Sequence, residues 1–171
     1  MARLGIRTEF GSPLALAVEA RRGRWLGVIS PLLPNGRLGW VDGRTVHTAS
    51  VQTRIEISLS KQRLVLLRGK KVLERTSLGI GAAATPTPTG RFAVTDKLSG
   101  EAYGGVYGCC ILALSAHQQH PSPTWTGSDT RIGIHGGALG AISNGCLHAS
   151  TNALRFLMTH VPLGTRVTIR R

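Results

Sequence analysis

Apolar and polar residues alternate along several short stretches of the chain, which is the pattern of a strand buried on one face. Residues 54–60 alternate most regularly, with Ile55, Ile57 and Leu59 on one side. Other short apolar stretches are bounded by glycine, proline or polar turn residues. They predict strands at residues 23–29, 38–41, 64–67, 71–73, 92–94, 111–115, 132–134 and 166–170. The pattern therefore predicts a mainly β protein, with loops at residues 97–108 and 116–130.

Helical spacing is convincing in one stretch, near the end of the chain. Its apolar residues recur three and four positions apart: Leu154, Leu157, Met158 and Val161. A hydroxyl side chain at position 150 or 151 is a suitable N-cap, and a proline at position 162 ends the pattern. We therefore predict one helix beside the strands.

Length and composition suit a medium domain preceded by a small one. Apolar residues make up 42% of the 171 residues and aromatic residues only 5%, so aliphatic side chains must build the core. Residues 1–50 are expected to form a small β module around the turn Pro34-Asn35-Gly36, and residues 51–171 the main domain. The module is similar to a partial bacterial SH3-like unit, although a β-extension packed on the main domain would have the same pattern.

The chain is strongly basic. It has 21 lysine and arginine residues against eight acidic ones, a net charge of +13. This charge favours anionic partners, although a solvated basic surface explains it equally simply. Specific nucleic-acid binding is not predicted, because no basic cluster is interleaved with aromatic residues. Salt-dependent affinity for duplex DNA would revive that alternative.

Three cysteines are present, at positions 109, 110 and 146. Neighbouring cysteines do not bridge each other without backbone strain, so we expect Cys109 and Cys110 to be small core or semi-buried thiols. The odd count in any case leaves at least one cysteine outside an intrachain disulfide.

Residues at the start of the chain lack the apolar stretch of a signal peptide, and no stretch is long and apolar enough to span a membrane. If the protein acts outside the cytoplasm, we expect its export signal to be absent from this chain.

The richest stretch for chemistry is residues 131–150. A short apolar run ends at His135, and glycines follow at positions 136 and 137. A loop of small residues then leads to Cys146, which Gly145 precedes. A thiol nucleophile needs a base and an exposed turn, and histidine and glycine supply these. The stretch therefore predicts a cysteine–histidine pair.

These motifs resemble the catalytic domain of the L,D-transpeptidases of the YkuD type. The matching positions are His135-Gly136 and residues 143–147 (SNGCL), with His148 where the family commonly has arginine. Residues 85–92 (TPTPTGRF) resemble the family's T-P-x-G-x-F stretch with an extra Thr-Pro pair, and residues 163–167 (LGTRV) resemble its closing strand.

The resemblance implies a mixed β-sandwich of the L,D-transpeptidase catalytic fold with one flanking helix. It implies Cys146 as the nucleophile and His135 as the base, with the Gly136 carbonyl orienting the imidazole. The oxyanion would be held by backbone amides around Asn144, Gly145 and Cys146. Substrate contacts are expected from Ser143, Asn144, His148, Tyr107 and Trp125.

The implied activity is peptidoglycan L,D-transpeptidation, forming 3→3 cross-links through a cysteine thioester at a site outside the cytoplasmic membrane. Alternatives are an L,D-carboxypeptidase or a wall-anchoring transferase with the same pair, and a non-catalytic wall-binding protein. The expected partners are peptidoglycan stem peptides and anionic wall polymers. The oligomeric state is open.

No cofactor or metal is implied. The histidines at 117, 120, 135 and 148 could be combined with Cys146 as a zinc set, but their spacing is not that of known structural sites. A neighbouring imidazolium stabilises a thiolate, so we also predict that His135 lowers the pKa of Cys146, with an ion pair formed before substrate binds.

Overall fold

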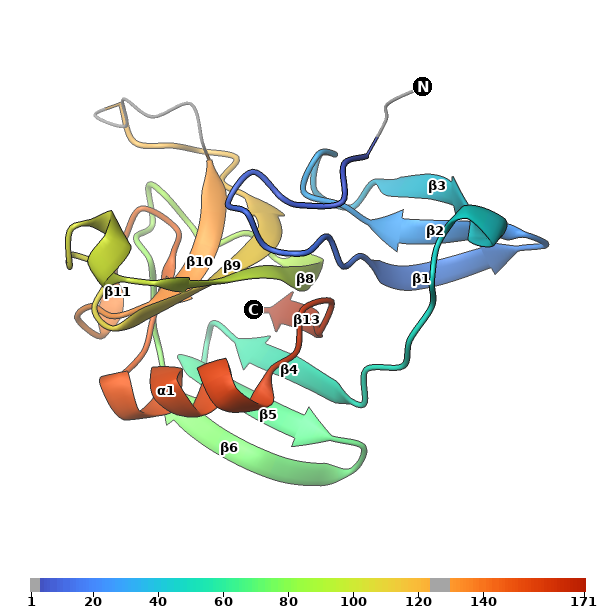
Figure 1. The fold of residues 1–171 in the computed structure, drawn as a ribbon. Coiled ribbons are helices and arrows are strands. Elements are labelled where there is room, and N and C mark those ends of the chain that lie inside the picture. Colours follow the sequence, from blue (N-terminus) through green and yellow to red (C-terminus); the bar gives the residue numbers. More distant parts are fainter. Residues whose placement is uncertain (1–3, 124–129) are drawn as a thin grey trace.

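The computed structural model describes residues 4–123 and 130–171. Within them the chain forms a three-stranded sheet, a ten-stranded sheet and one α-helix (Figure 1).

The smaller sheet belongs to the first part of the chain. It is antiparallel, in the order β1 (Ala17–Arg22), β2 (Trp25–Ile29) and β3 (Leu38–Asp42), and the short 3-10 helix η1 (Gly43–Thr45) follows it. The strands expected at 23–29 and 38–41 are confirmed, and the Arg37 amide donates to the Pro34 carbonyl in the turn between them. The first strand was not predicted, because its sequence AVEARR has no period-two alternation.

The larger sheet contains both parallel and antiparallel pairs. Its strands lie in the order β11-β7-β12-β10-β9-β8-β13-β4-β5-β6. Their bounds are β4 (Thr53–Ser58), β5 (Arg63–Arg68), β6 (Lys71–Ser77), β7 (Gly79–Gly81), β8 (Gly90–Ser99), β9 (Cys110–His117), β10 (Arg131–His135), β11 (Gly140–Ser143), β12 (Leu147–His148) and β13 (Arg166–Arg170). A second 3-10 helix, η2 (Glu101–Tyr103), lies between β8 and β9.

The large sheet curls around one core. Figure 1 shows β8–β10 on one side and β4–β6 on the other, with α1 (Thr151–His160) alongside. Aliphatic side chains fill the space between these walls, as the composition predicts. The largest buried side chains of this core are the aromatic Phe92 and the aliphatic Ile55, Leu64, Leu66, Leu78, Leu112, Leu114, Ile132, Ile134, Leu147 and Leu154. The expected mainly β fold with one flanking helix is confirmed.

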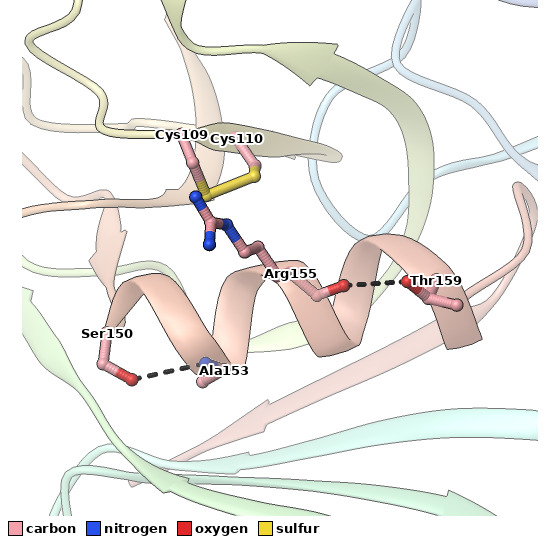
Figure 2. The surroundings of a disulfide bond; sticks show 6 residues. All are labelled: Cys109, Cys110, Ser150, Ala153, Arg155 and Thr159. Atoms are coloured by element: carbon pink, nitrogen blue, oxygen red, sulfur yellow. Dashed lines mark hydrogen bonds between the residues drawn. A yellow bond between two sulfur atoms is a disulfide. The ribbon is translucent and has the colours of Figure 1, made fainter.

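The helix begins where its sequence signals place it. Ser150 is the N-cap and its hydroxyl accepts a hydrogen bond from the Ala153 amide at 3.3 Å (Figure 2). Leu154 and Leu157 are fully buried against the sheet, which explains the helical spacing of apolar residues. No helix in the described part of the chain has the length and apolar character needed to cross a bilayer.

Cys109 and Cys110 correct one expectation. The structure joins them in a disulfide, which lies above α1 in Figure 2. Their positions are as expected, because Cys110 is buried and Cys109 packs partly buried against the same core. The sequence argued against the pairing because a bridge between adjacent cysteines strains the backbone, and within a strand their side chains would also point to opposite faces. Cys109 lies just before β9 and follows Gly108 at a φ of 71°, so strand alternation does not govern it.

The small sheet is attached to the large one by hydrogen bonds of Asn35 and ion pairs of Glu19. The Asn35 side chain donates to the His117 carbonyl at 2.7 Å and accepts from the His117 amide at 2.9 Å. Glu19 pairs with Arg91 at 2.9 Å and with Arg166 at 3.3 Å. The predicted module thus packs on β8, β9 and β13 of the larger sheet.

A buried arginine ties the first residues to the same sheet. Arg131 is 8% exposed and pairs with Glu9 and, at 3.8 Å, with Asp96. Asp96 is fully buried and accepts a hydrogen bond from the Thr8 hydroxyl. Such a cluster keeps a buried charge compensated only while its partners are in place.

A chain starting at Val51 is therefore expected to fold but to melt earlier. Loss of the Asn35 and Glu9 contacts should cost about 2 kcal/mol and lower Tm by about 4–8 °C. Acylation by a carbapenem should persist, since none of the residues predicted to carry chemistry precedes Val51. Thermal melts and intact-mass spectra test both expectations. A well-folded shortened chain that no longer reacts would place part of the site in residues 1–50.

Candidate active site

Strand pairing brings the proposed nucleophile to the proposed base. β10 and β12 pair in parallel, with Ile134 opposite Leu147 and His135 opposite His148. The same register sets Cys146 beside Gly133, whose amide donates to the Cys146 sulfur at 3.5 Å. Gly133 and His135 lie two residues apart and therefore on one face of β10. Gly133 thus neighbours both residues, because its amide contacts the Cys146 sulfur and it lies on the His135 face of β10.

The imidazole of His135 is held in one tautomer. Its Nδ1 lies 2.7 Å from the Gly136 carbonyl oxygen, which can only accept, so Nδ1 carries the proton. The lone pair of the neutral ring is then on Nε2. A Cβ placed on Gly133 would lie 3.8 Å from His135 Cδ2, the carbon next to Nε2. The basic nitrogen is therefore on the side of the ring that faces Gly133. The carbonyl contact implied by the family resemblance is confirmed.

Burial makes the His135 side chain a weaker base than a free imidazole. Its side chain is 6% exposed, and desolvation lowers its pKa below the usual 6.5. The nearby charge of His148 lowers the pKa further, while the bond to the Gly136 carbonyl acts in the opposite direction. The neutral form therefore prevails at neutral pH. This favours His135 as a general base and opposes the ion pair that we predicted before substrate binds.

Two aromatic rings border the imidazole of His135. The Tyr107 ring meets it edge-on with centroids 4.8 Å apart, and the His148 ring lies tilted, also at 4.8 Å. His148 Nδ1 is 2.8 Å from the Ala138 carbonyl, which fixes that ring in turn. Tyr107 and His148 thus line the base, where we expected substrate contacts.

Gly136 lets the loop before β9 approach the site. Its amide donates to the Tyr107 carbonyl at 2.7 Å. A Cβ on Gly136 would lie 2.9 Å from Gly108 Cα, closer than side chains tolerate. Glycine at this position therefore permits the approach that places Tyr107 against His135.

Ser143 braces the cysteine loop from within. Its hydroxyl accepts from the Gly145 amide at 3.1 Å and donates to the Cys146 carbonyl at 2.6 Å. The side chain is buried at 7% exposure. Both bonds are internal to the loop, so Ser143 shapes the turn in addition to any contact with substrate.

Three further side chains clamp the carbonyl groups of this loop. Thr85 donates to the Ser143 carbonyl at 2.9 Å and Thr87 to the Gly145 carbonyl at 2.9 Å. Gln118 Nε2 donates to the Asn144 carbonyl at 2.8 Å. All four carbonyls of Ser-Asn-Gly-Cys therefore accept from side chains, which fixes the direction of every peptide in the turn.

Sequence reasoning marked residues 85–92 through their likeness to a family motif, and the structure sets two of their threonines against the cysteine loop. That reasoning gave no role to Thr85, Thr87 or Gln118. Gln118 falls in a stretch expected to be a loop, and no spacing signal marks it. The contact between Gln118 and the loop requires glycine at position 145. Gly145 has a φ of 107° and lies so close to Gln118 that an added Cβ would be 2.2 Å from Gln118 Nε2.

The remaining expected site residues are placed differently. Asn144 is exposed at the tip of the cysteine loop. Trp125 lies outside the described residues. His117, one of the histidines of the zinc combination that the spacing argued against, has its Nε2 2.6 Å from the Pro31 carbonyl oxygen. Within residues 4–123 and 130–171, no group of three His, Cys, Asp or Glu side chains could hold a metal ion.

Comparison with known proteins decides the family. The chain matches YkuD, the L,D-transpeptidase catalytic domain, over residues 52–169. The chain belongs to this family. YkuD of Bacillus subtilis (strain 168), named as an L,D-transpeptidase, is 30% identical over 122 residues, 71% of this chain and 68% of that protein. The Bacillus licheniformis protein of the same name is 29% identical over 120 residues, 70% of this chain and 67% of that protein.

Solved structures share the fold. Bd1075 of Bdellovibrio bacteriovorus superposes with a TM-score of 0.54 at 19% identity, covering 70% of this chain and 48% of that one. L,D-transpeptidase 3 of Mycobacterium tuberculosis, in complex with a faropenem-derived adduct, gives 0.52 at 14% identity, covering 70% and 60%. This chain thus spans about half to three fifths of those structures. The L,D-transpeptidase fold expected from the motifs is confirmed.

The carbonyl clamp of this L,D-transpeptidase domain can be tested at Thr87. Thr87→Val removes the donor to the Gly145 carbonyl and the acceptor of the Gly81 amide, 2.8 Å away, and leaves both groups buried. We expect a loss of about 2 kcal/mol of stability and acylation slowed about tenfold. Thr87→Ser should keep both the stability and the acylation rate of the wild type. Thr89 is exposed in the same loop, so Thr89→Val should change neither quantity. Thermal melts and acylation rates measure the effects; equal rates in the two valine variants would contradict the clamp.

Proposed function

We propose that the protein is a peptidoglycan L,D-transpeptidase that forms 3→3 cross-links through a thioester on Cys146. The observation that carries the proposal is that Gly133 borders both Cys146, through its amide, and His135, whose basic nitrogen is Nε2. The family membership supports a reaction on the wall, and we propose that it takes place outside the cytoplasmic membrane.

In the first half-reaction His135 takes the thiol proton and the Cys146 sulfur attacks the carbonyl of the third residue of a tetrapeptide stem. The carbon–sulfur bond forms and a tetrahedral oxyanion results. When it collapses, the bond to the fourth residue breaks and D-alanine leaves with the proton from His135. The acyl group remains on Cys146 as a thioester.

In the second half-reaction the side-chain amine of a third residue on a neighbouring stem attacks the thioester. His135 accepts a proton from that amine and returns it to the departing Cys146 sulfur. A new amide joins the two third residues, and the enzyme returns to its starting state. Neither half-reaction involves a change of oxidation state.

Backbone amides of the clamped turn are the proposed oxyanion donors. In this conformation the Gly145 amide donates to the Ser143 hydroxyl. Gly145 is therefore proposed to serve through the conformation that it gives the turn rather than as an oxyanion donor. Tyr107, Asn144 and His148 are the described side chains that we propose to contact the stem peptide.

Purified tetrapeptide stems test the proposal directly. Mass spectrometry of the products should show 3→3 dimers with release of D-alanine. Tripeptides without dimers would instead make the protein an L,D-carboxypeptidase, and transfer of stems to a protein amine would make it an anchoring transferase. Unchanged tetrapeptides, with no adduct on Cys146 from a carbapenem, would leave a non-catalytic wall-binding protein.

A further inference from the structure

A second surface stands out at the opposite end of the large sheet from Cys146. A groove of about 420 Å³ lies on the outer face of β13, β4, β5 and β6. Counted along the sheet, these strands are separated from β10 and β12 by β9 and β8. Five of the groove's residues are basic: Lys61, Arg63, Arg75, Arg170 and Arg171.

Strand register sets the spacing of the arginines. Arg170 is paired with Ser58, and Ser58 with Arg63, so the two arginines are two strands apart, or about 10 Å. Arg75 is paired with Val65, which makes it a diagonal neighbour of Arg63 at about 7–8 Å. The three guanidinium groups are therefore borne by one rigid face, with a serine hydroxyl between two of them.

These cations are not neutralised within the described chain. None of these five side chains takes part in an ion pair within the described residues. By contrast, Arg91 on β8 and Arg166 on β13 both pair with Glu19. Glu56 is the one acidic side chain that lines the described groove, and it already pairs with Arg54 at 2.9 Å. The groove therefore concentrates positive charge beyond what the dispersed basic sequence suggests.

We propose that this groove binds a linear phosphodiester polymer, and so holds the enzyme on an anionic surface while Cys146 reacts elsewhere. Each phosphodiester presents two unesterified oxygens, which match the fork of an arginine. No aromatic side chain lines the described groove, so it offers no platform for stacked bases. A single-stranded nucleic acid therefore fits less well than a polymer of phosphate-linked polyols.

The test measures binding of fluorescent poly(glycerol phosphate) by anisotropy over a range of salt concentrations. Arg63→Gln/Arg75→Gln/Arg170→Gln should weaken binding by about tenfold or more and reduce the log–log salt slope by about 2. Its control, Arg21→Gln/Arg68→Gln/Arg155→Gln, removes the same charge from exposed positions outside the groove and should lose less than about threefold. Equal losses of affinity in both triple variants would show a general attraction of the polymer to a basic protein, and would overturn the proposal that the groove is the binding site.

Two further comparisons decide the ligand class. Poly-L-glutamate and single-stranded oligothymidylate should each bind more weakly than poly(glycerol phosphate), and tighter binding of either would overturn the phosphodiester assignment. Carbapenem acylation of Cys146 should be the same in both triple variants and the wild type. Loss of acylation with intact polymer binding would count against the proposed transpeptidase function alone.

Discussion

Replacing Cys146 by alanine is expected to abolish cross-linking and carbapenem acylation while leaving the fold intact. No other described group is placed to form the thioester, so activity should fall to the uncatalysed level. The side chain is half-buried and its loop is held by bonds to backbone carbonyls, so stability should change by about 1 kcal/mol or less. Product analysis by mass spectrometry, beside a thermal melt, measures both effects.

The matched control removes the other two cysteines. Cys109→Ser/Cys110→Ser deletes the disulfide but leaves the Cys146 sulfur at the Gly133 amide, so the carbapenem adduct should still map to the peptide that contains Cys146. Dimers formed by the alanine variant, or an adduct that disappears from the folded serine variant, would exclude Cys146 as the nucleophile.

Replacing His135 by alanine should slow acylation by about 10²–10⁴-fold, the usual contribution of a general base. Alkylation by iodoacetamide should fall less, because it needs no proton donor for a leaving amine. Without a base to take the thiol proton, the pH dependence of alkylation should follow ionisation of the thiol alone, whose free value is about 8.5. If the variant's alkylation profile overlays that of the wild type, His135 does not act on Cys146.

The wild-type pH profile follows from the lowered pKa of His135. A pKa below 6.5 keeps the base neutral to lower pH, so the acid limb of acylation should lie below 6.5. His148→Gln removes a charge that lowers this pKa, and should therefore shift the acid limb upward. The free energy of unfolding should change in the same direction. Neutral His135 contributes its full share of stability above pH 6.5, and this share is lost as the pH falls through the pKa of the folded state. An unshifted limb in the glutamine variant would exclude His148 as the neighbouring charge.

Elements with a strong local signature were predictable from the sequence. The helix at Thr151–His160 and the last strand at Arg166–Arg170 lie where period, cap and flanking proline placed them. Strand ends were predicted wrongly where the alternation of apolar residues stops. Strand β8 continues to Ser99, beyond the apolar residues 92–94 and into residues expected to form a loop. Backbone hydrogen bonds with β9 extend that strand, and such bonds produce no pattern of side chains that could be recognised in the sequence.

The short strands β7, β11 and β12 were decided by tertiary structure. Each has two to four residues, too few for any alternation to be recognised. Yet β12 supplies the parallel pairing that sets Cys146 beside Gly133. Local glycines marked both members of the reactive pair in the sequence, but their meeting depends on this pairing.

The sequence by itself determined the mainly β class, the helix, the family motifs and the candidate pair Cys146 and His135. Tertiary structure alone decided the clamp by Thr85, Thr87 and Gln118, the lowered pKa of His135, and the basic groove. The reason is physical. A strand or a cap is specified by neighbours a few residues away, whereas the clamp joins groups 26 to 58 positions apart. Burial and charge density likewise arise only when distant segments pack together.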